Sequence, residues 1–239
     1  MTWPAVPWSQ VPTMSSTALR QADEQASSRF GIEPIQLMEV AGWQIARVVD
    51  DFVGGVRGKR VIVVAGSGNN GGDALVAARF LQQRGGLVRA SIVPGRDPNS
   101  LAARHARTVR ALDIATQEAP EGVDPSADVI VDGLFGIGIR LPLRDPAPRI
   151  IEAMHASGVP IVAVDVPSGL DADSGAGGES AVRAAATITL VAPKPGLKGS
   201  TNAGRVLVAD IGMPVAVFST EQAALTALYQ IGDVVELTN

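Results

Sequence analysis

The clearest strand signal in the chain is an apolar, β-branched run, Val-Ile-Val-Val, at positions 61–64. A glycine-rich turn follows at 66–73, and apolar residues then recur at helical spacing over 75–81. Glycines let a ligand approach the backbone closely, and the free N–H groups at a helix start favour an anion. The pattern therefore predicts a phosphate-binding strand, turn and helix, although its G-x-G-x-x-G spacing is by itself a weak signal.

The rest of the pattern alternates strands with helices. Apolar runs predict strands at 88–93, 128–132, 160–165, 187–192 and 206–209, and helical spacing predicts helices at 15–30, 34–52, 100–112 and 218–229. Such alternation is typical of an α/β domain with a mostly parallel sheet. No linker divides the chain, so residues 1–239 are expected to form one domain.

Three of these strands are followed by small polar residues. Asn70 lies after the first strand, Asp132 ends the second, and Asp165 with Ser168 ends the third. Ligands of an open parallel sheet bind beyond the carboxyl ends of its strands, where these side chains would converge. A carboxylate that caps the next helix would explain one of these residues, but not their recurrence.

Two stretches bear on a partner subunit. Residues 1–12 hold three prolines and two tryptophans, and are expected to form an extended arm that packs on a partner. The helix at 34–52 carries a broad apolar face, interpreted as core or as a subunit interface. Together they favour a homodimer.

Composition narrows the classes of function. The 239 residues carry 20 basic and 24 acidic side chains, a formal charge of -4, so no basic field favours nucleic acid or an anionic membrane. No apolar run approaches the about 20 residues of a membrane span, and no signal peptide is recognised, so the expected location is the cytoplasm.

Few side chains remain for catalysis. The absence of cysteine excludes thiolate chemistry, and neither His105 nor His155 is expected to be catalytic. His105 lies among arginines on a helix face interpreted as solvated. Arg96 or Asp97 would reach a ribose, but a turn role is favoured for Asp97, which precedes a proline.

The glycine turn itself carries polar side chains that serve no packing purpose. Asn69, Asn70 and Asp73 offer two carboxamides and a carboxylate, which bind hydroxyls, amides or a cation. The turn is therefore interpreted as functional.

Five motifs, in order, resemble the YjeF N-terminal domain family, the NAD(P)H-hydrate epimerases. They are Gly-Asn-Asn-Gly-Gly-Asp at 68–73, Asp-Gly-Leu-Phe-Gly at 132–136, Val-Asp-Val-Pro-Ser-Gly-Leu-Asp at 164–171, Ala-Pro-Lys-Pro-Gly at 192–196 and Ala-Asp-Ile-Gly at 209–212. The resemblance implies a three-layer αβα sandwich of Rossmann type, usually dimeric. It also implies interconversion of the R and S forms of hydrated NADH or NADPH (NADHX and NADPHX) at nicotinamide C6, with a potassium ion at the site.

The same resemblance implies the site residues. Potassium would be held by Asn70, Asp132 and Ser168, and the substrate would be lined by Asn69, Asn70, Gly71, Gly72, Asp73, Gly136, Ile137, Gly138, Ile139, Arg140 and Asp165. The dehydratase domain that some members carry is not found in this sequence, so a separate NAD(P)H-hydrate dehydratase is the expected functional partner.

Inversion at C6 needs a proton donor and a proton acceptor beside the hydroxyl group, but no oxidant. In a chain without cysteine or a well-placed histidine, Asp165 is the first candidate for this proton transfer and Asp73 is the second. Lys194 is interpreted either as a phosphate contact or as a solvated lysine.

Two positions depart from the family pattern, and two other classes of function remain. Ala74 stands where the family usually has glycine, and Val40 where it usually has asparagine. The change at Val40 removes a polar group from a pocket contact or from a helix-packing bond.

Two alternative functions are kept. One is a non-catalytic nucleotide-binding or scaffold protein of the same family. An NAD(P)-dependent oxidoreductase ranks lower, because the only tyrosine is Tyr229, near the end of the chain.

Overall fold

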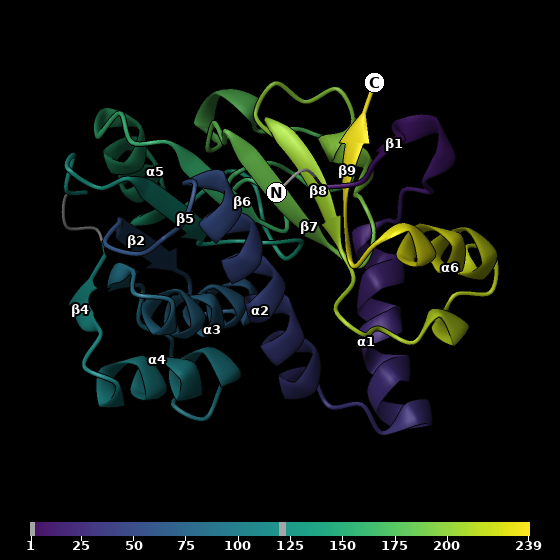
Figure 1. Cartoon of the computed structure of the whole chain (residues 1–239), viewed down its shortest axis with the longest axis horizontal. Helices are drawn as coiled ribbons and strands as arrows, with labels where there is room; N and C mark the ends of the chain where they lie inside the picture. The colour runs from purple at the N-terminus through teal and green to yellow at the C-terminus, as the bar shows by residue number, and fades with distance from the viewer. Residues whose placement is uncertain (1–2, 120–122) are drawn as a thin grey trace.

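The computed structural model describes residues 3–119 and 123–239 (Figure 1). Its helices are α1 (Ser16–Phe30), α2 (Pro34–Phe52), α3 (Asn69–Gln83), α4 (Leu101–Ala111), α5 (Ala147–Ala156) and α6 (Gln222–Ile231). Its strands are β1 (Ala5–Pro7), β2 (Arg60–Ala65), β3 (Leu87–Ile92), β4 (Ala115–Glu118), β5 (Val129–Gly133), β6 (Ile161–Val164), β7 (Ala186–Leu190), β8 (Arg205–Ala209) and β9 (Val234–Thr238).

All nine strands form one sheet, in the order β1-β9-β8-β7-β6-β5-β2-β3-β4. Every neighbouring pair is parallel except β8 and β9. From β2 the chain runs outward to β3 and β4, and then returns to β5 on the other side of β2. The carboxyl ends of β2 and β5 therefore border a topological switch point, where open α/β sheets bind ligands.

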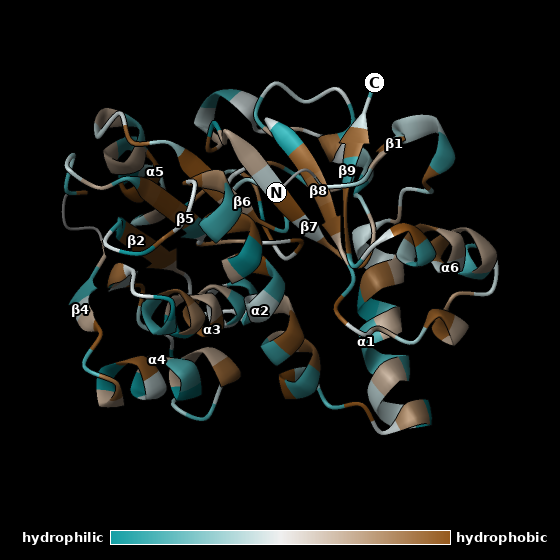
Figure 2. Cartoon of the chain, in the orientation of Figure 1, coloured by the Kyte–Doolittle hydropathy of each residue, from teal (hydrophilic) through white to brown (hydrophobic). Residues whose placement is uncertain are grey.

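Two apolar cores lie on opposite faces of the sheet. Because alternate residues of a strand point to opposite faces, Val61 and Val63 of β2 join one core, whereas Ile62 and Val64 join the other. Helices α1, α2, α3, α4 and α6 contribute buried residues to the first core, and α5 contributes to the second. Figure 2 shows the central strands β5, β6 and β7 mostly brown between these helices. The expected three-layer αβα architecture is confirmed.

The first two helices begin and end as their sequence chemistry predicts. The Ser15 side chain accepts a hydrogen bond from the Ala18 N–H at 3.2 Å, and Gly31 closes α1 with a φ of +66°. Helix α2 begins at Pro34, whose fixed φ suits a first helical position.

The apolar pattern of the sequence does not predict three elements of the structure, α5, β4 and β9. None of the described helices has both the length and the apolarity to cross a membrane.

The N-terminal arm belongs to the sheet of its own chain. Strand β1 pairs in parallel with β9, and Val6 and Val11 are buried in the first core. The indole N–H of Trp3 donates to a carboxylate oxygen of Asp51 at 3.1 Å. The expectation of an extended segment is confirmed at β1, which pairs with the last strand of its own chain. That the arm also packs on a partner subunit stays a prediction.

The apolar face of α2 is also internal. Leu37, Ala41 and Ile45 are buried in the first core, while Val40 and Trp43 are 39% and 42% exposed. The interpretation of this face as core is confirmed, and most of the apolar surface that favoured a homodimer is covered by the chain itself. The homodimer stays a prediction.

His105 on α4 is buried, not solvated. It is 5% exposed, and its Nε2 atom has no hydrogen-bond partner within the part of the chain that the structure describes. Burial lowers the pKa of His105. The interpretation as a solvated face is wrong, because Ala102, Ala106 and Val109 place His105 on the buried stripe of the helix.

Candidate functional site

The turn after β2 is shorter than its glycines suggest. Helix α3 begins at Asn69, so the two asparagines and Asp73 lie in its first turns. A Cβ on Gly66 would lie 2.0 Å from the carbonyl oxygen of Leu134, so only glycine permits this close approach to the loop after β5. The start of α3 therefore lies at the carboxyl end of the sheet, where its free N–H groups attract negative charge.

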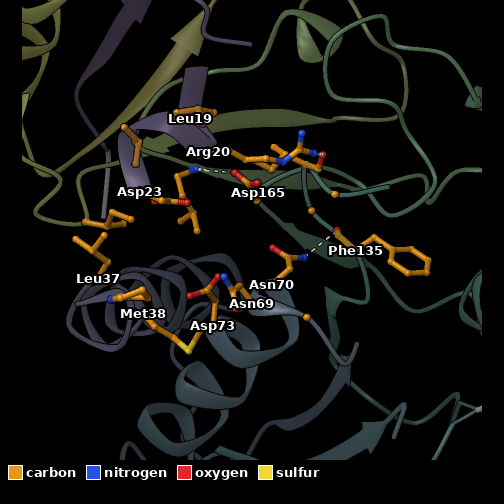
Figure 3. Close-up of a pocket in the computed structure, with 18 of the residues that line it drawn as sticks. Leu19, Arg20, Asp23, Leu37, Met38, Asn69, Asn70, Asp73, Phe135 and Asp165 are labelled. Carbon is orange, nitrogen blue, oxygen red and sulfur yellow. Dashed lines mark hydrogen bonds between the residues drawn. The ribbon is translucent and has the colours of Figure 1, made fainter. Parts of the chain in front are cut away.

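A hydrogen-bonded network joins the ends of β2, β5 and β6. Asn70 donates through Nδ2 to the carbonyl oxygen of Phe135 at 2.8 Å, a bond drawn in Figure 3. The Phe135 N–H donates to Ser168 Oγ at 2.8 Å, and Ser168 Oγ donates to Asp132 Oδ1 at 2.6 Å. The structure thus brings Asn70, Asp132 and Ser168 together around the backbone of Phe135.

Asp132 lies fully buried at the centre of this network. Its Oδ2 atom accepts from the Ser168 N–H at 2.9 Å, and its Oδ1 atom also accepts from the Leu134 N–H at 3.2 Å. In the described residues, every group that donates to Asp132 is neutral. Burial raises the pKa of Asp132 to about 6, and the hydrogen bonds from Ser168 and Leu134 lower it only in part.

Asp165 is held in a different way. It follows β6 with a φ of +66°, and its N–H donates to the carbonyl oxygen of Ile188 at 2.7 Å. Its Oδ1 atom accepts from Lys194 Nζ and from the Leu190 N–H, the latter at 3.2 Å. Across residues 3–119 and 123–239, no donor is found for its Oδ2 atom, which lies 3.2 Å from the position of a Cβ built on Gly136. One oxygen of Asp165 is anchored and the other is free.

These strand ends open into a cavity of about 590 Å³, shown in close-up in Figure 3. The expected substrate residues that line this cavity are Asn69, Asn70, Asp73, Gly136, Ile137, Gly138 and Asp165. Asp132 and Ser168 do not line it, because they lie behind the Phe135 backbone.

Four other expected substrate residues do not line the cavity. A Cβ on Gly71 would lie 1.9 Å from the Gly66 carbonyl oxygen, and one on Gly72 would lie 2.7 Å from the Met38 side chain. These two glycines therefore permit close packing of α3 and are not in contact with the cavity. Ile139 and Arg140 border a second cavity, of about 380 Å³.

Three carboxylates face the larger cavity: Asp23 from α1, Asp73 from α3 and Asp165 after β6 (Figure 3). Burial raises the pKa of Asp73 well above its ordinary value, the charges of Asp165 and Asp23 raise it further, and Lys194 lowers it. Burial and the charge of Asp165 also raise the pKa of Asp23. Asp73 is therefore protonated at pH values where an ordinary carboxyl group is ionised.

The sequence analysis missed two polar residues that line the cavity and left the role of a third undecided. Asp23 and Arg20 look like members of the solvated face of α1, but Arg20 donates through Nη2 to the carbonyl oxygen of Ile137 at 2.7 Å. Lys194 is 1% exposed and forms an ion pair with Asp165, so its interpretation as a solvated lysine is wrong. The available signal for Lys194 was its place between two prolines in a motif shared with the family.

The two departures from the family pattern lie away from the cavity. The methyl group of Ala74 faces Gly133, where a Cβ would lie only 2.4 Å away, so the glycine makes room for it. Val40 is exposed on α2 and does not line the cavity, so the expected loss of a pocket contact at Val40 is wrong.

Comparison with known proteins gives matches over most of the chain. The family described as YjeF-related protein N-terminus matches residues 34–196. An NAD(P)H-hydrate epimerase of Rhodopirellula baltica is 35% identical over 214 residues, which cover 86% of this chain and 86% of that protein. An NAD(P)H-hydrate epimerase of Weissella koreensis is 36% identical over 203 residues, which cover 82% of this chain and 89% of that protein.

Longer relatives and a solved structure match as well. A bifunctional NAD(P)H-hydrate repair enzyme Nnr of Mycobacterium tuberculosis is 39% identical over 174 residues, 72% of this chain but 35% of that protein. The crystal structure of yeast ynu0 matches with a TM-score of 0.73 and 27% identity, over 83% of this chain and 88% of that chain. The family match begins at Pro34, so α1, with Arg20 and Asp23, lies outside it.

Proposed function

The chain belongs to the YjeF N-terminal domain family, and from this premise we propose that it is an NAD(P)H-hydrate epimerase, which interconverts the R and S forms of NADHX and NADPHX at nicotinamide C6. The observation that carries the proposal is a pair of carboxyl groups, Asp73 and Asp165, that face one cavity at the switch point of the sheet. Burial raises the pKa of Asp73 well above its ordinary value, and Asp165 forms an ion pair with Lys194. The enzyme is an isomerase that acts in metabolite repair.

Inversion at C6 by exchange of the hydroxyl group needs two proton transfers. Asp73, which is held protonated, donates its proton to the leaving hydroxyl, and the C–O bond breaks to release water. Water then adds to the opposite face of C6 and gives a proton to Oδ2 of Asp165. One proton has moved from Asp73 to Asp165, and exchange with solvent through the cavity returns it.

The charge in the cavity suits this reaction. When the hydroxyl group leaves, the ring nitrogen donates its electron pair and the ring becomes cationic. In this proposal the Asp165 carboxylate lies beside that ring, and a fixed negative charge there stabilises the developing positive charge. The pyrophosphate would lie at the start of α3, where free N–H groups attract anions.

The network around Asp132 fits a potassium ion. Asp132 is a buried carboxylate whose described partners are all neutral, and Asn70, Ser168 and the Phe135 carbonyl add neutral oxygen ligands beside it. Such an all-oxygen donor set with one negative charge suits a hard monovalent cation. When bound by Asn70, Asp132 and Ser168, the ion would order the loops and offset the charge of the pyrophosphate.

A separate NAD(P)H-hydrate dehydratase would consume the epimer that this protein supplies, and the longer relative described as bifunctional supports that link. A homodimer would use the exposed part of α2 near Trp43. Light scattering at micromolar concentration tests the dimer, and replacement of Trp43 by Glu is expected to dissociate it.

The purified protein, incubated with the R epimer of NADHX, tests the function when conversion to the S epimer is followed by chromatography. We expect equilibration of the epimers at a rate proportional to enzyme concentration. Nucleotide binding without epimerisation of either form would instead support the alternative, a non-catalytic nucleotide-binding or scaffold protein of the same family.

A further inference from the structure

Lys194 has no part in the proton transfers described above, yet its side chain is among the most buried in the protein. We propose that Lys194 is the positioning residue of the reaction: its ammonium group anchors Oδ1 of Asp165, so that Oδ2 is the single oxygen that reaches the substrate. This inference rests on the proposed function and assigns to Lys194 the orientation of its catalytic carboxylate.

The ammonium group has a full set of acceptors. Besides Oδ1 of Asp165, Lys194 Nζ donates to Thr189 Oγ1 at 3.0 Å and to the Leu190 carbonyl oxygen at 2.8 Å. A charged lysine has three N–H donors and a neutral one has two, so three acceptors match the charged form. The three bonds also fix the direction of the Lys194 side chain.

The backbone around the ion pair is shaped to support it. The Leu190 N–H donates to Oδ1 of Asp165, while the carbonyl oxygen of the same residue accepts from Lys194. Val191, next in the chain, has a φ of +68°, a conformation that a β-branched side chain rarely adopts. Such strain persists where the surrounding structure imposes it, often at functional sites.

The charges in the cavity explain why Asp165 needs this anchor. Asp73 and Asp23 face the same space, and Arg20 lines its edge. Without the ammonium group, Asp165 would lie among other carboxyl groups with no fixed partner for either oxygen except the Leu190 N–H. A buried ion pair is often replaced by apolar residues at little cost in stability, so stability alone does not explain its presence.

The test compares Lys194→Met with Lys198→Met, an exposed lysine four positions along the chain. Epimerisation of NADHX, nucleotide affinity and the thermal midpoint are measured for both. We expect Lys194→Met to lower kcat by at least about 10-fold, because the carboxylate of Asp165 loses the partner that fixes the direction of its oxygens. KM is expected to change by less than about 3-fold. Lys198→Met should match the wild type.

A double-mutant cycle separates action through Asp165 from a direct role. If Lys194 acts only through that carboxylate, Lys194→Met causes no further loss of kcat in an Asp165→Asn background. Thr189→Val removes one acceptor of the ammonium group and leaves both charges in place. Thr189→Val should lower kcat by about 2-fold to 5-fold at unchanged KM. If Lys194→Met does not fold, Thr189→Val is the variant that tests the inference.

Three results would overturn the inference while the proposed function stands. They are a wild-type kcat in folded Lys194→Met, an equal loss of kcat with and without the Asp165 carboxylate, or a wild-type kcat in Thr189→Val when Lys194→Met is unfolded. A wild-type protein that binds nucleotide but epimerises neither form would instead remove the proposed function, and this inference with it.

Discussion

Asp132, inside β5, and Asp165, directly after β6, are buried carboxylates at the carboxyl ends of two neighbouring strands, but their surroundings differ. Both oxygens of Asp132 accept hydrogen bonds from neutral groups, and the residue does not reach the cavity. Asp165 lines the cavity, and it has a charged partner, Lys194, at its Oδ1 atom and no donor among the described residues at its Oδ2 atom. Similar positions in the sheet therefore give two carboxylates that differ in their hydrogen-bond partners and in their access to the cavity.

The difference shows which surroundings suit a structural carboxylate and which suit a carboxylate that transfers a proton. The carboxylate of Asp132, whose described donors are all neutral, holds neighbouring loops together, and the cation proposed there is untested. A carboxylate with one oxygen anchored by a lysine presents its other oxygen in a defined direction, which suits proton transfer. Four predictions test this contrast, in order of decreasing effect.

Asp165→Asn is expected to slow epimerisation by at least about 10²-fold while nucleotide binding persists, because the amide keeps the shape of the side chain but accepts no proton. Initial rates and nucleotide affinity are measured separately. Asp113→Asn is the matched control, since Asp113 is an exposed aspartate that also has a positive φ. If Asp165→Asn retains turnover and Asp73→Asn abolishes it, the base is Asp73 and the contrast fails.

The raised pKa of Asp132, about 6 against an ordinary 3.8, predicts a pH dependence of stability without potassium. The folded state binds this proton more tightly than the unfolded state. The contribution is therefore fully present below about pH 4 and is lost as the pH rises through about 6, by up to about 3 kcal/mol.

Denaturation in potassium chloride and in choline chloride, at about pH 5 and pH 7.5, measures this effect of Asp132. Potassium should stabilise the wild type more at the higher pH, where the carboxylate is charged. Asp132→Asn should abolish that difference between the salts. Equal stability in both salts at the higher pH would mean that Asp132 holds no cation.

Arg20→Met is expected to raise KM by about 2-fold to 10-fold with a smaller change in kcat, because one hydrogen bond between α1 and the Ile137 carbonyl is lost. The effect lies at the edge of the cavity, away from the free oxygen of Asp165. Arg29→Met, in the last turn of the same helix, serves as the control. A fall in kcat comparable to that of Asp165→Asn would place Arg20 in the chemistry itself.

Val40→Asn is expected to change kcat and KM by less than about 2-fold, because Val40 is exposed and does not line the cavity. The variant restores the residue usual in the family. A several-fold gain in activity would show that this face of α2 acts on the site from outside, and that the contrast between the two carboxylates is not the main determinant of activity.

The sequence by itself determined the features that arise within short stretches. The β-branched run at 61–64 specifies a buried strand, and the first two helices follow from their apolar spacing and their caps. Asp132 and Asp165 were recognisable because each ends an apolar run, and strands in a parallel sheet end on the same side. Potassium, the homodimer and the cytoplasmic location stay predictions.

Tertiary structure alone decided which groups meet. Lys194 lies 29 positions from Asp165, and Arg20 lies 117 positions from Ile137, so no local pattern links them. The same holds for Asp23 in the cavity, for β1 on β9, and for the assignment of neutral donors to one carboxylate and a lysine to the other. Periodicity records which face of an element is buried, whereas the charge and direction of a side chain at a site depend on partners that only the folded chain brings within a few ångströms.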